Sequence, residues 1–192
     1  MEHIVQFFDI PESLGGAVAR FVHDGVIAGE TALVVARPAS VHAIAQALNA
    51  RGLTLPTLLD GGSLVVRDAA TTMRAVMGDR EPRAADFDRV LGAFVRKLAA
   101  DAPRGLRVYG EMVDILAAEG NFYGAEKLEA LWNQLGETVP FTLLCGYSSA
   151  HFAGTSAGHG HLRSVCDLHS RVHQDRIDVL GNWLLSNAES VN

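Results

Sequence analysis

Short apolar runs alternate with amphipathic segments along this chain, and that alternation constrains the fold more than any other feature. The runs "HIVQFF" (3–8), "TALVVAR" (31–37), "GLRVYGEM" (105–112) and "PFTLLCGYS" (140–148) predict buried strands. Between them, segments such as "SVHAIAQALNARG" (40–52) repeat apolar residues at helical spacing. Strands alternating with helices predict an α/β fold with a mostly parallel central sheet.

The remaining segments are assigned from caps, turn residues and periodicity. Ser13 is the predicted cap of the helix that follows the first strand. Residues 57–69 are predicted to form a strand, a tight glycine turn and a second strand, with a loop as the alternative to the first strand. Helices are predicted at about 69–77, 84–100, 112–118 and 121–136. "AHFAGTSAGHGH" (150–161) is predicted as a loop, and a last helix runs from near His161 towards His173.

Length predicts one domain, here placed at 1–173, followed by a C-terminal helix or tail at 174–192. Within that tail, "DRIDVLGNWLLSN" (175–187) has apolar residues at near-helical spacing. Such a segment is either a docking or dimer helix, which makes a homodimer one possible assembly, or a helix packed on its own domain.

The formal net charge of −6, with no basic run longer than two residues, argues against a nucleic-acid partner. No apolar stretch reaches the roughly 20 residues that a membrane span requires, and no signal peptide is visible. We therefore expect a cytoplasmic chain, in which Cys145 and Cys166 are free thiols.

Ligands of parallel α/β sheets collect beyond the carboxyl ends of the strands. This rule points to Phe8–Asp9, Arg37, Gly110–Glu111 and Cys145–Tyr147. Glu111 is either a ligand-facing carboxylate, or a helix cap or ion-pair partner of Arg37 or Arg107. For Arg107 itself, a structural pairing with Glu111 or Glu126 is favoured.

The loop "DIPESLGG" (9–16) lies where a phosphate-binding loop would precede its helix, yet it contains no lysine. A phosphate loop acts through backbone N–H groups, the helix dipole and a lysine on the terminal phosphates. Glu12 adds a negative charge at the predicted helix start, where it would repel phosphate. ATP hydrolysis is therefore disfavoured, and no cofactor is expected.

The stretch "RFVHDGVIAGETALVVA" (20–36) is similar to the start of RecA/KaiC-like ATPases. "HIVQFF", "LRVYGEM" (106–112), "AEKLEALWNQL" (125–135), "FTLLCGYSSAHF" (141–152) and "LRSVCDLHSRV" (162–172) follow in order. Together they resemble the MEDS domain, a methanogen/methylotroph sensory domain, over about residues 1–173.

The resemblance implies a RecA/KaiC-like three-layer sandwich with a degenerate phosphate loop, used for sensing and often fused to DNA-binding or histidine-kinase parts. Residue by residue, it points to His3, Arg107, Glu111, Glu126, Cys145, Tyr147 and His169. Of these, the predicted ligand-binding residues are His3, Arg107, Glu111, Cys145, Tyr147 and His169. No helix-turn-helix or kinase segment follows residue 173, so an output role depends on a signalling partner, a histidine kinase or a regulator.

The histidine-rich C-terminal region raises the question of a metal. On a helix, Cys166 and His169 share a face, as do His169 and His173, and each pair could chelate an ion. No Cys-x-x-Cys or His-Glu-x-x-His motif supports a metal site, so we expect no bound metal. The candidate ligands for the alternative, a metal site, are Cys166, His169 and His173. Cys145 is a small core residue, a nucleophile, or a ligand-facing or redox-responsive thiol, and the last of these is favoured over the nucleophile.

These observations predict a non-catalytic signalling domain that senses a small molecule in bacterial or archaeal transcriptional or two-component regulation. The ligand would shift the population of one conformation and so change contacts with a signalling protein. The alternatives are a ligand-independent scaffold and, less favoured, a residual ATPase or a thiol-dependent enzyme.

Overall fold

A six-stranded sheet organises the chain, whose computed structural model describes residues 1–153 and 156–174. All its strand pairs are parallel, in the order β3-β2-β4-β5-β1-β6. The strands are β1 (Glu2–Phe8), β2 (Thr31–Ala36), β3 (Leu64–Asp68), β4 (Leu106–Gly110), β5 (Thr142–Ser148) and β6 (Arg171–Gln174). Parallel strands need crossover connections, and these place helices on both faces of the sheet.

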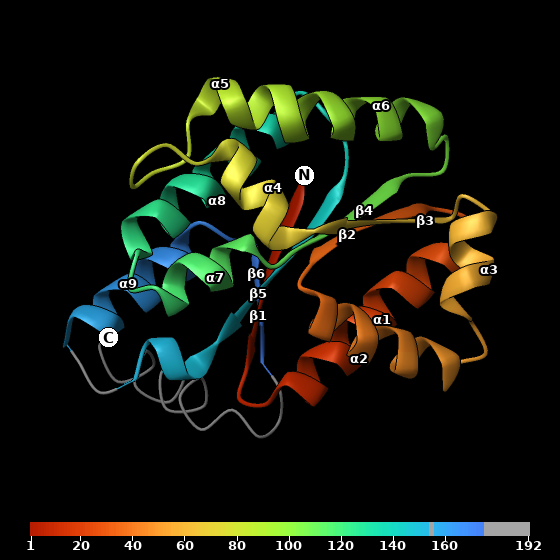
Figure 1. Cartoon of the computed structure of the whole chain (residues 1–192), viewed down its shortest axis with the longest axis horizontal. Helices are drawn as coiled ribbons and strands as arrows, with labels where there is room; N and C mark the ends of the chain where they lie inside the picture. The colour runs from red at the N-terminus through yellow and green to blue at the C-terminus, as the bar shows by residue number, and fades with distance from the viewer. Residues whose placement is uncertain (154–155, 175–192) are drawn as a thin grey trace.

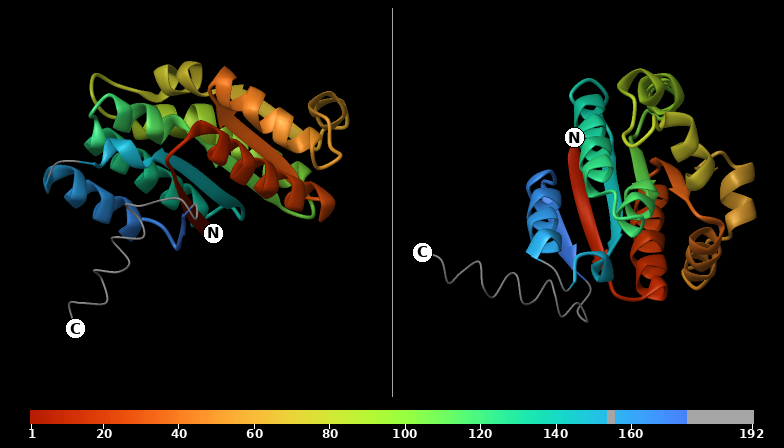
Figure 2. Two further views of the ribbon diagram at one scale, coloured as in Figure 1. Left: turned by 90° about the horizontal axis from the view of Figure 1, so that it is seen from below. Right: turned by 60° about the vertical axis from the view of Figure 1, so that its left-hand side comes forward.

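Helices form one layer on each face of the sheet (Figures 1 and 2). One layer contains α1 (Pro11–Ile27), α2 (Pro38–Asn49) and α3 (Leu55–Asp60). The other contains α4 (Ala69–Val76), α5 (Ala84–Phe87), α6 (Ala93–Asp101), α7 (Met112–Ala118), α8 (Phe122–Gly136) and α9 (Ser156–Asp167). A π-helical turn (Asp88–Gly92) joins α5 to α6, and a 3-10 turn (Ser149–His151) follows β5. The predicted three-layer α/β sandwich is confirmed.

Alternate residues of each strand point to opposite layers, so two hydrophobic cores form. Val5 of β1 and Leu143 of β5 pack towards α4–α9, whereas Leu144 packs towards α1 and α2. Trp132 of α8 is fully buried, and its ring lies edge-on to Phe87 with centroids 5.1 Å apart. This tryptophan is a packing residue.

The predicted secondary structure was wrong in three places, two of them in the C-terminal part of the chain. The predicted loop at 150–161 contains the start of α9 at Ser156, and α9 ends at Asp167. Residues 171–174 then form β6, a strand where the helix was expected to continue. The first half of 57–69 is mostly helical, because α3 ends at Asp60. Residues 175–187 lie outside the described part of the chain.

The first helix begins at Pro11, so only two residues separate it from β1. Proline suits a first helical position because its missing N–H is not needed there. Ile10 occupies the cap position and Ser13 Oγ donates to the Ile10 carbonyl at 2.9 Å, so the predicted cap at Ser13 was wrong. The paired glycines, Gly15 and Gly16, are therefore helical residues.

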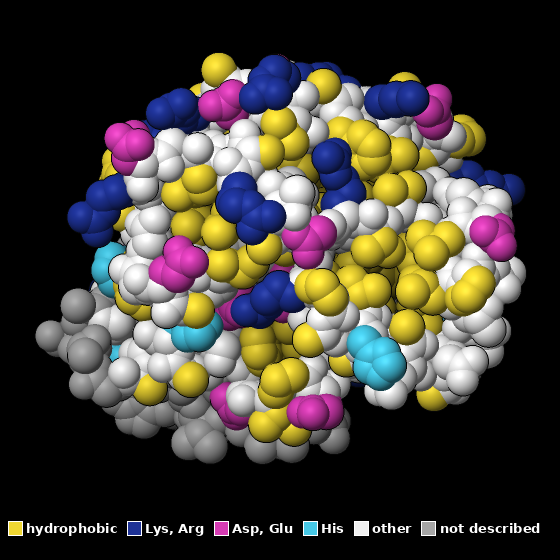
Figure 3. All heavy atoms as spheres, in the orientation of Figure 1, with side chains coloured by type: hydrophobic (Ala, Val, Ile, Leu, Met, Phe, Trp, Pro, Cys, Tyr) yellow, Lys and Arg dark blue, Asp and Glu magenta, His cyan; other side chains and the backbone are white. Residues whose placement is uncertain are grey.

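Figure 3 shows basic and acidic side chains interspersed over one face of the molecule, with hydrophobic side chains between them. Within the described residues, none of the helices has the length and apolar character needed to cross a bilayer.

The two helical glycines of α1 predict opposite effects of alanine. A Cβ on Gly15 would lie 2.9 Å from Ala43 Cβ of α2, whereas a Cβ on Gly16 meets no atom within 4 Å. Alanine normally stabilises a helix interior by about 1 kcal/mol relative to glycine. We expect Gly16→Ala to raise the free energy of unfolding by about that amount and Gly15→Ala to lower it. Urea unfolding measures both, and equal stabilisation would contradict the close approach of α1 to α2.

Candidate functional site

Five buried polar side chains meet between the sheet and the layer of α8 and α9. They come from β1, α8, β5 and the turn before β6, and we name them the His–Cys–Glu cluster: His3, Glu129, Cys145, Tyr147 and His169. The side chains of Glu129 and His169 have no solvent exposure, and His3, Cys145 and Tyr147 are also buried. Buried polar groups are costly unless they are paired, so their mutual contacts decide what the cluster can do.

The Glu129 carboxylate lies at the centre of the cluster. Its Oε1 accepts a hydrogen bond from the Tyr147 hydroxyl at 2.9 Å, and its Oε2 accepts one from the Cys145 thiol at 3.2 Å. His3 Nε2 lies 3.2 Å from Oε2, and His169 Nε2 lies 3.3 Å from Oε1. Each carboxylate oxygen therefore contacts one imidazole and one hydroxyl or thiol.

The strand register explains how residues so far apart in the sequence meet. β1 pairs with β5 so that Val5 faces Cys145 and Phe7 faces Tyr147 across the ladder. Side chains two positions apart share a face, so His3, Cys145 and Tyr147 all point towards α8. Glu129 lies on the buried side of α8, one position after Leu128 and three before Trp132.

Burial and charge act against each other on the pKa of Glu129 and of His169, and they act together on the pKa of Cys145 and of Tyr147. Burial alone would raise the pKa of Glu129, but the two imidazoles outweigh it and hold that pKa well below its ordinary value. Burial and the Glu129 carboxylate raise the pKa of both Cys145 and Tyr147. Burial would lower the pKa of His169, yet the same carboxylate raises it. Glu129 is thus ionised, while Cys145 is a poor nucleophile.

A second polar network lies at the carboxyl edge of the sheet and centres on Arg37. Its backbone N–H donates to Glu111 Oε2 at 2.7 Å, and its side-chain Nε donates to Oε1 at 2.9 Å. The guanidinium also bonds Asp114 of α7, and Ser40 Oγ donates to Glu111 Oε1 at 2.6 Å. Glu111 is fully buried, so an internal ion pair satisfies it.

Asp114 connects this network to the end of β5. Its Oδ1 accepts the Ser148 backbone N–H at 2.8 Å and lies 3.0 Å from His151 Nε2. Burial would raise the pKa of Asp114, but His151, Ser148 and Arg37 together lower it. Burial would lower the pKa of Arg37, and its two carboxylate partners raise it instead. The network is therefore held in its charged form.

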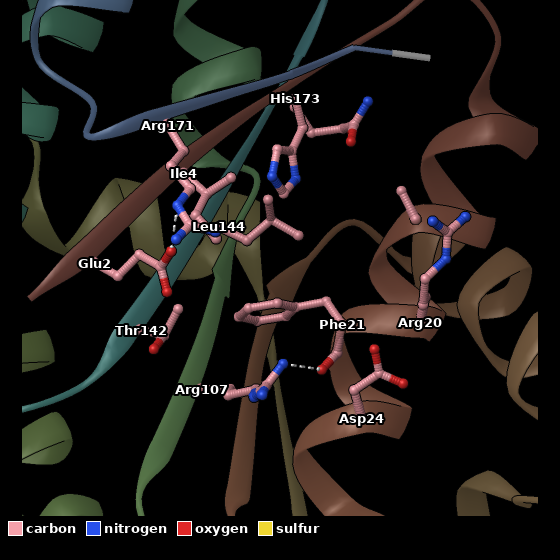
Figure 4. A pocket seen from close by; sticks show the side chains of 12 residues that line it. Glu2, Ile4, Arg20, Phe21, Asp24, Arg107, Thr142, Leu144, Arg171 and His173 are labelled. Atoms are coloured by element: carbon pink, nitrogen blue, oxygen red, sulfur yellow. Dashed lines mark hydrogen bonds and ion pairs between the residues drawn. The ribbon is translucent and has the colours of Figure 1, made fainter. Parts of the chain in front are cut away.

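A groove of about 270 Å³ opens on the other face of the sheet, between α1 and the edge strand β6 (Figure 4). Arg107 of β4 lies in it, donates to the Phe21 carbonyl at 3.1 Å and forms an ion pair with Glu30. Arg171 and His173 of β6 form its far wall.

Comparison with known proteins identifies the family. Residues 2–170 match the model of the methanogen/methylotroph, DcmR sensory domain, MEDS. The chain belongs to the MEDS family. This MEDS domain therefore has a general role in sensing and signalling.

The fold is also found among solved structures. A KaiC-like protein from the archaeon Pyrococcus horikoshii superposes with a TM-score of 0.59 at 12% identity, over 93% of this chain and 75% of that one. At that identity the likeness shows the fold alone, a RecA/KaiC-like sandwich. A comparison with curated proteins finds no match.

The six predicted ligand-binding residues lie in three different places in this MEDS domain. The structure brings together His3, Cys145, Tyr147 and His169. Glu111 lies in the carboxyl-edge network, where its partner is Arg37. Arg107 lies in the groove, so its predicted pairing with Glu111 or Glu126 was wrong.

The candidate metal residues of the C-terminal region do not converge either. Cys166 is half-buried on α9 and His173 lines the groove on the opposite face of the sheet from His169. Their predicted common helical face was wrong, because α9 ends before His169. Both Cys145 and Cys166 are free thiols, as predicted.

Glu129 is the residue that the sequence reasoning missed. Its neighbour Glu126, which the family resemblance suggested, instead lies 2.8 Å from His161 Nδ1. The signal was available: Ala125, Leu128 and Trp132 form an apolar stripe on α8, and Glu129 falls within it. A carboxylate on an apolar stripe indicates a buried partner.

The lowered pKa of Asp114 predicts a pH-dependent stability. The pKa of an unfolded aspartate is about 3.9, and Asp114 contributes its full stabilisation above that pH. The contribution is lost as the pH falls through the lower pKa of the folded state. We expect Asp114→Asn to cost about 1–3 kcal/mol at pH 7. The deficit should shrink as the pH falls below about 4, because the unfolded aspartate is protonated first and native Asp114 follows at a lower pH. Urea unfolding at pH 7, 4 and 3 measures this.

Exposed Asp60 supplies the matched control for that measurement. Asp60→Asn should change the free energy of unfolding by less than about 0.5 kcal/mol at each pH. A deficit of Asp114→Asn that stays constant from pH 7 to pH 3 would contradict the assigned ion pair.

Proposed function

We propose that this MEDS domain is a non-catalytic input domain that binds a small ligand at the His–Cys–Glu cluster and changes its contacts with a signalling protein in response. The proposal places it in bacterial or archaeal transcriptional or two-component regulation. One observation carries it: in a sensory family, four polar side chains from three distant segments converge on the buried carboxylate of Glu129. Stability alone does not call for such a cluster, since well-packed hydrophobic residues serve a core as well or better.

Two connections could transmit a change at the cluster to the surface. On β5, Cys145 and Tyr147 contact Glu129, and the next residue, Ser148, donates its N–H to Asp114 at the carboxyl edge. On the other side, Asn133 Nδ2 donates to the Leu168 carbonyl at 2.9 Å, tying α8 to the turn before β6. A ligand that favours one arrangement of these contacts would shift the population towards it.

The chemistry of the site supports binding over catalysis. The Cys145 thiol is buried with a raised pKa, the opposite of what a nucleophilic thiol needs. At the start of α1, Glu12 lies in the first turn and residues 9–16 contain no lysine, so a triphosphate would find no fixed positive side chain there.

Replacing Tyr147 should weaken ligand retention. Its hydroxyl orients Glu129, so we expect Tyr147→Phe to lose most of any small ligand that co-purifies with the wild-type chain. Native mass spectrometry of protein purified without added ligand measures the occupied fraction. The control is Tyr123→Phe, which changes an exposed tyrosine of α8 and should retain the wild-type occupancy. If the domain is a ligand-independent scaffold, the wild type and both variants should carry no ligand. Equal occupancy in the two variants would mean that the ligand binds outside the His–Cys–Glu cluster.

The non-catalytic assignment has its own test. With magnesium and ATP, we expect phosphate release by the wild-type chain to equal that of Glu111→Ala and of the buffer alone. Magnesium-dependent turnover that exceeds the Glu111→Ala background would establish a residual ATPase and overturn the assignment.

A further inference from the structure

Four donor atoms in the His–Cys–Glu cluster have the spacing of a tetrahedral metal site. One ring nitrogen each of His3 and His169, Cys145 Sγ and a Glu129 carboxylate oxygen all lie within 4.8 Å of one another. His3 Nε2 lies 3.2 Å from Glu129 Oε2 and 3.5 Å from Cys145 Sγ, which lies 3.2 Å from the same oxygen. Bonds of about 2.0–2.3 Å to a central ion give tetrahedral edges of about 3.3–3.8 Å. Small adjustments would therefore seat one ion among all four donors.

The hydrogen bonds around the two histidines fix which nitrogen is available. His169 Nδ1 lies 2.6 Å from the Val165 carbonyl, which can only accept, so Nδ1 carries the hydrogen. His3 Nδ1 lies 2.9 Å from Asn133 Oδ1, and Asn133 uses its Nδ2 to donate to Leu168. Both neutral imidazoles therefore present a bare Nε2 to the cluster. Metal-ligating histidines are held in this way, with the other N–H donated to a carbonyl or carboxylate.

If neither imidazole were protonated and no metal were bound, both bare nitrogens would face the Glu129 carboxylate, which is an unfavourable arrangement. His169 Nε2 is buried and makes no hydrogen bond among the described residues, although it lies 3.3 Å from Glu129 Oε1. One imidazolium would balance the Glu129 charge but leave the second lone pair opposed to the carboxylate. Protonating both imidazoles would leave a net buried positive charge, which is costly.

A divalent metal resolves both problems together. Binding of the ion releases the Cys145 thiol proton to solvent. With the resulting thiolate, the Glu129 carboxylate and two neutral imidazoles, the site and a doubly charged ion sum to zero charge. The ion also takes up both imidazole lone pairs. Tyr147 then holds the carboxylate by donating to Oε1, which leaves Oε2 for the ion.

We propose that this MEDS domain binds one divalent transition metal ion of the zinc class through His3, His169, Cys145 and Glu129. Two imidazoles, one thiolate and one carboxylate suit such an ion, whereas magnesium and calcium prefer oxygen donors alone. The inference rests on the proposed function, because it names the class of ligand that the same cluster takes.

Cobalt(II) is the probe, because its spectrum reports geometry and thiolate ligation. Titration of the reduced full chain should show one equivalent bound, tetrahedral d–d bands and a sulfur-to-cobalt charge-transfer band, all removed by added zinc. Cys145→Ser should lose the charge-transfer band. Cys166→Ser is the matched control, because this second free cysteine lies outside the cluster, and it should keep both the band and the stoichiometry.

Asn133 is a positioning residue, and its variants separate ligation from general destabilisation. Asn133→Ala should weaken zinc or cobalt binding by about 10–100-fold, as loss of a histidine's outer partner does. Asn133→Asp keeps an acceptor for His3 Nδ1 and should restore affinity to within a few-fold of wild type. Circular dichroism checks that each variant is folded.

Two results would overturn the metal site: a folded wild-type chain that takes up no more cobalt or zinc than Cys145→Ser, or a charge-transfer band that depends on Cys166. Hydrogen exchange with and without zinc separates this inference from the proposed function. Zinc bound without altered exchange in α8, α9 or β6 upholds the site but counts against signalling through it. An organic ligand retained through Tyr147 by a metal-free chain upholds the function and refutes the metal.

Discussion

The ionised carboxylate of Glu129 dictates which distant segments of the chain meet in the protein interior. An unpaired charge in a protein interior is very costly, so this residue requires partners that can balance it. Its partners come from β1, from β5 and from the turn between α9 and β6, and His3 and Cys145 are 142 positions apart. Strand β1 and the turn before β6 are thereby tied to α8, in the helix layer that covers this face of the sheet. Removal of either imidazole would leave the carboxylate undercompensated, which costs far more than an ordinary core substitution.

The carboxyl edge of the sheet is arranged by a different charge balance. Open α/β sheets collect ligands at that edge, and here the chain supplies its own ion pair between Arg37 and Glu111. Asp114 extends the pair to β5 through the Ser148 backbone. Since Tyr147 and Ser148 are consecutive, one strand joins the buried cluster to the edge network. A shift of β5 would therefore change hydrogen bonds in both the cluster and the edge network.

Periodicity predicted the elements that are buried on both faces and failed where burial is partial. β1, β2, β4 and β5 are apolar runs, and their pattern alone places them in a parallel sheet. β6 is "RVHQ", whose polar side chains border an open groove, so no apolar signal marks it. α9 begins in a glycine-rich and histidine-rich segment whose composition resembles a loop. In both cases the neighbouring strand and helix determine the structure, and the local sequence does not.

The candidate site was predictable in part, for a similar reason. Arg37 and Glu111 follow strand ends, so topology alone predicts that they meet at one edge of the sheet. The histidines are harder, because His3 and His169 converge only through the pairing of β6 with β1. Without β6, the sequence placed His169 on a helix beside Cys166. Glu129 stood within an apolar stripe of α8, and a residue that breaks the local pattern is often a functional one.

Burial also distinguishes the cluster from the groove as a place from which a signal could be sent. A ligand in the groove beside Arg107 would lie against α1, β1 and β6 without entering the protein interior, and a ligand that binds two conformations equally shifts neither. An occupant of the cluster is enclosed by β1, β5, α8 and the turn before β6, and the donors must change their contacts to admit it. The free energy of binding is then different for the two arrangements. That difference, set by the charge on Glu129, is what a sensory domain must pass on to its partner.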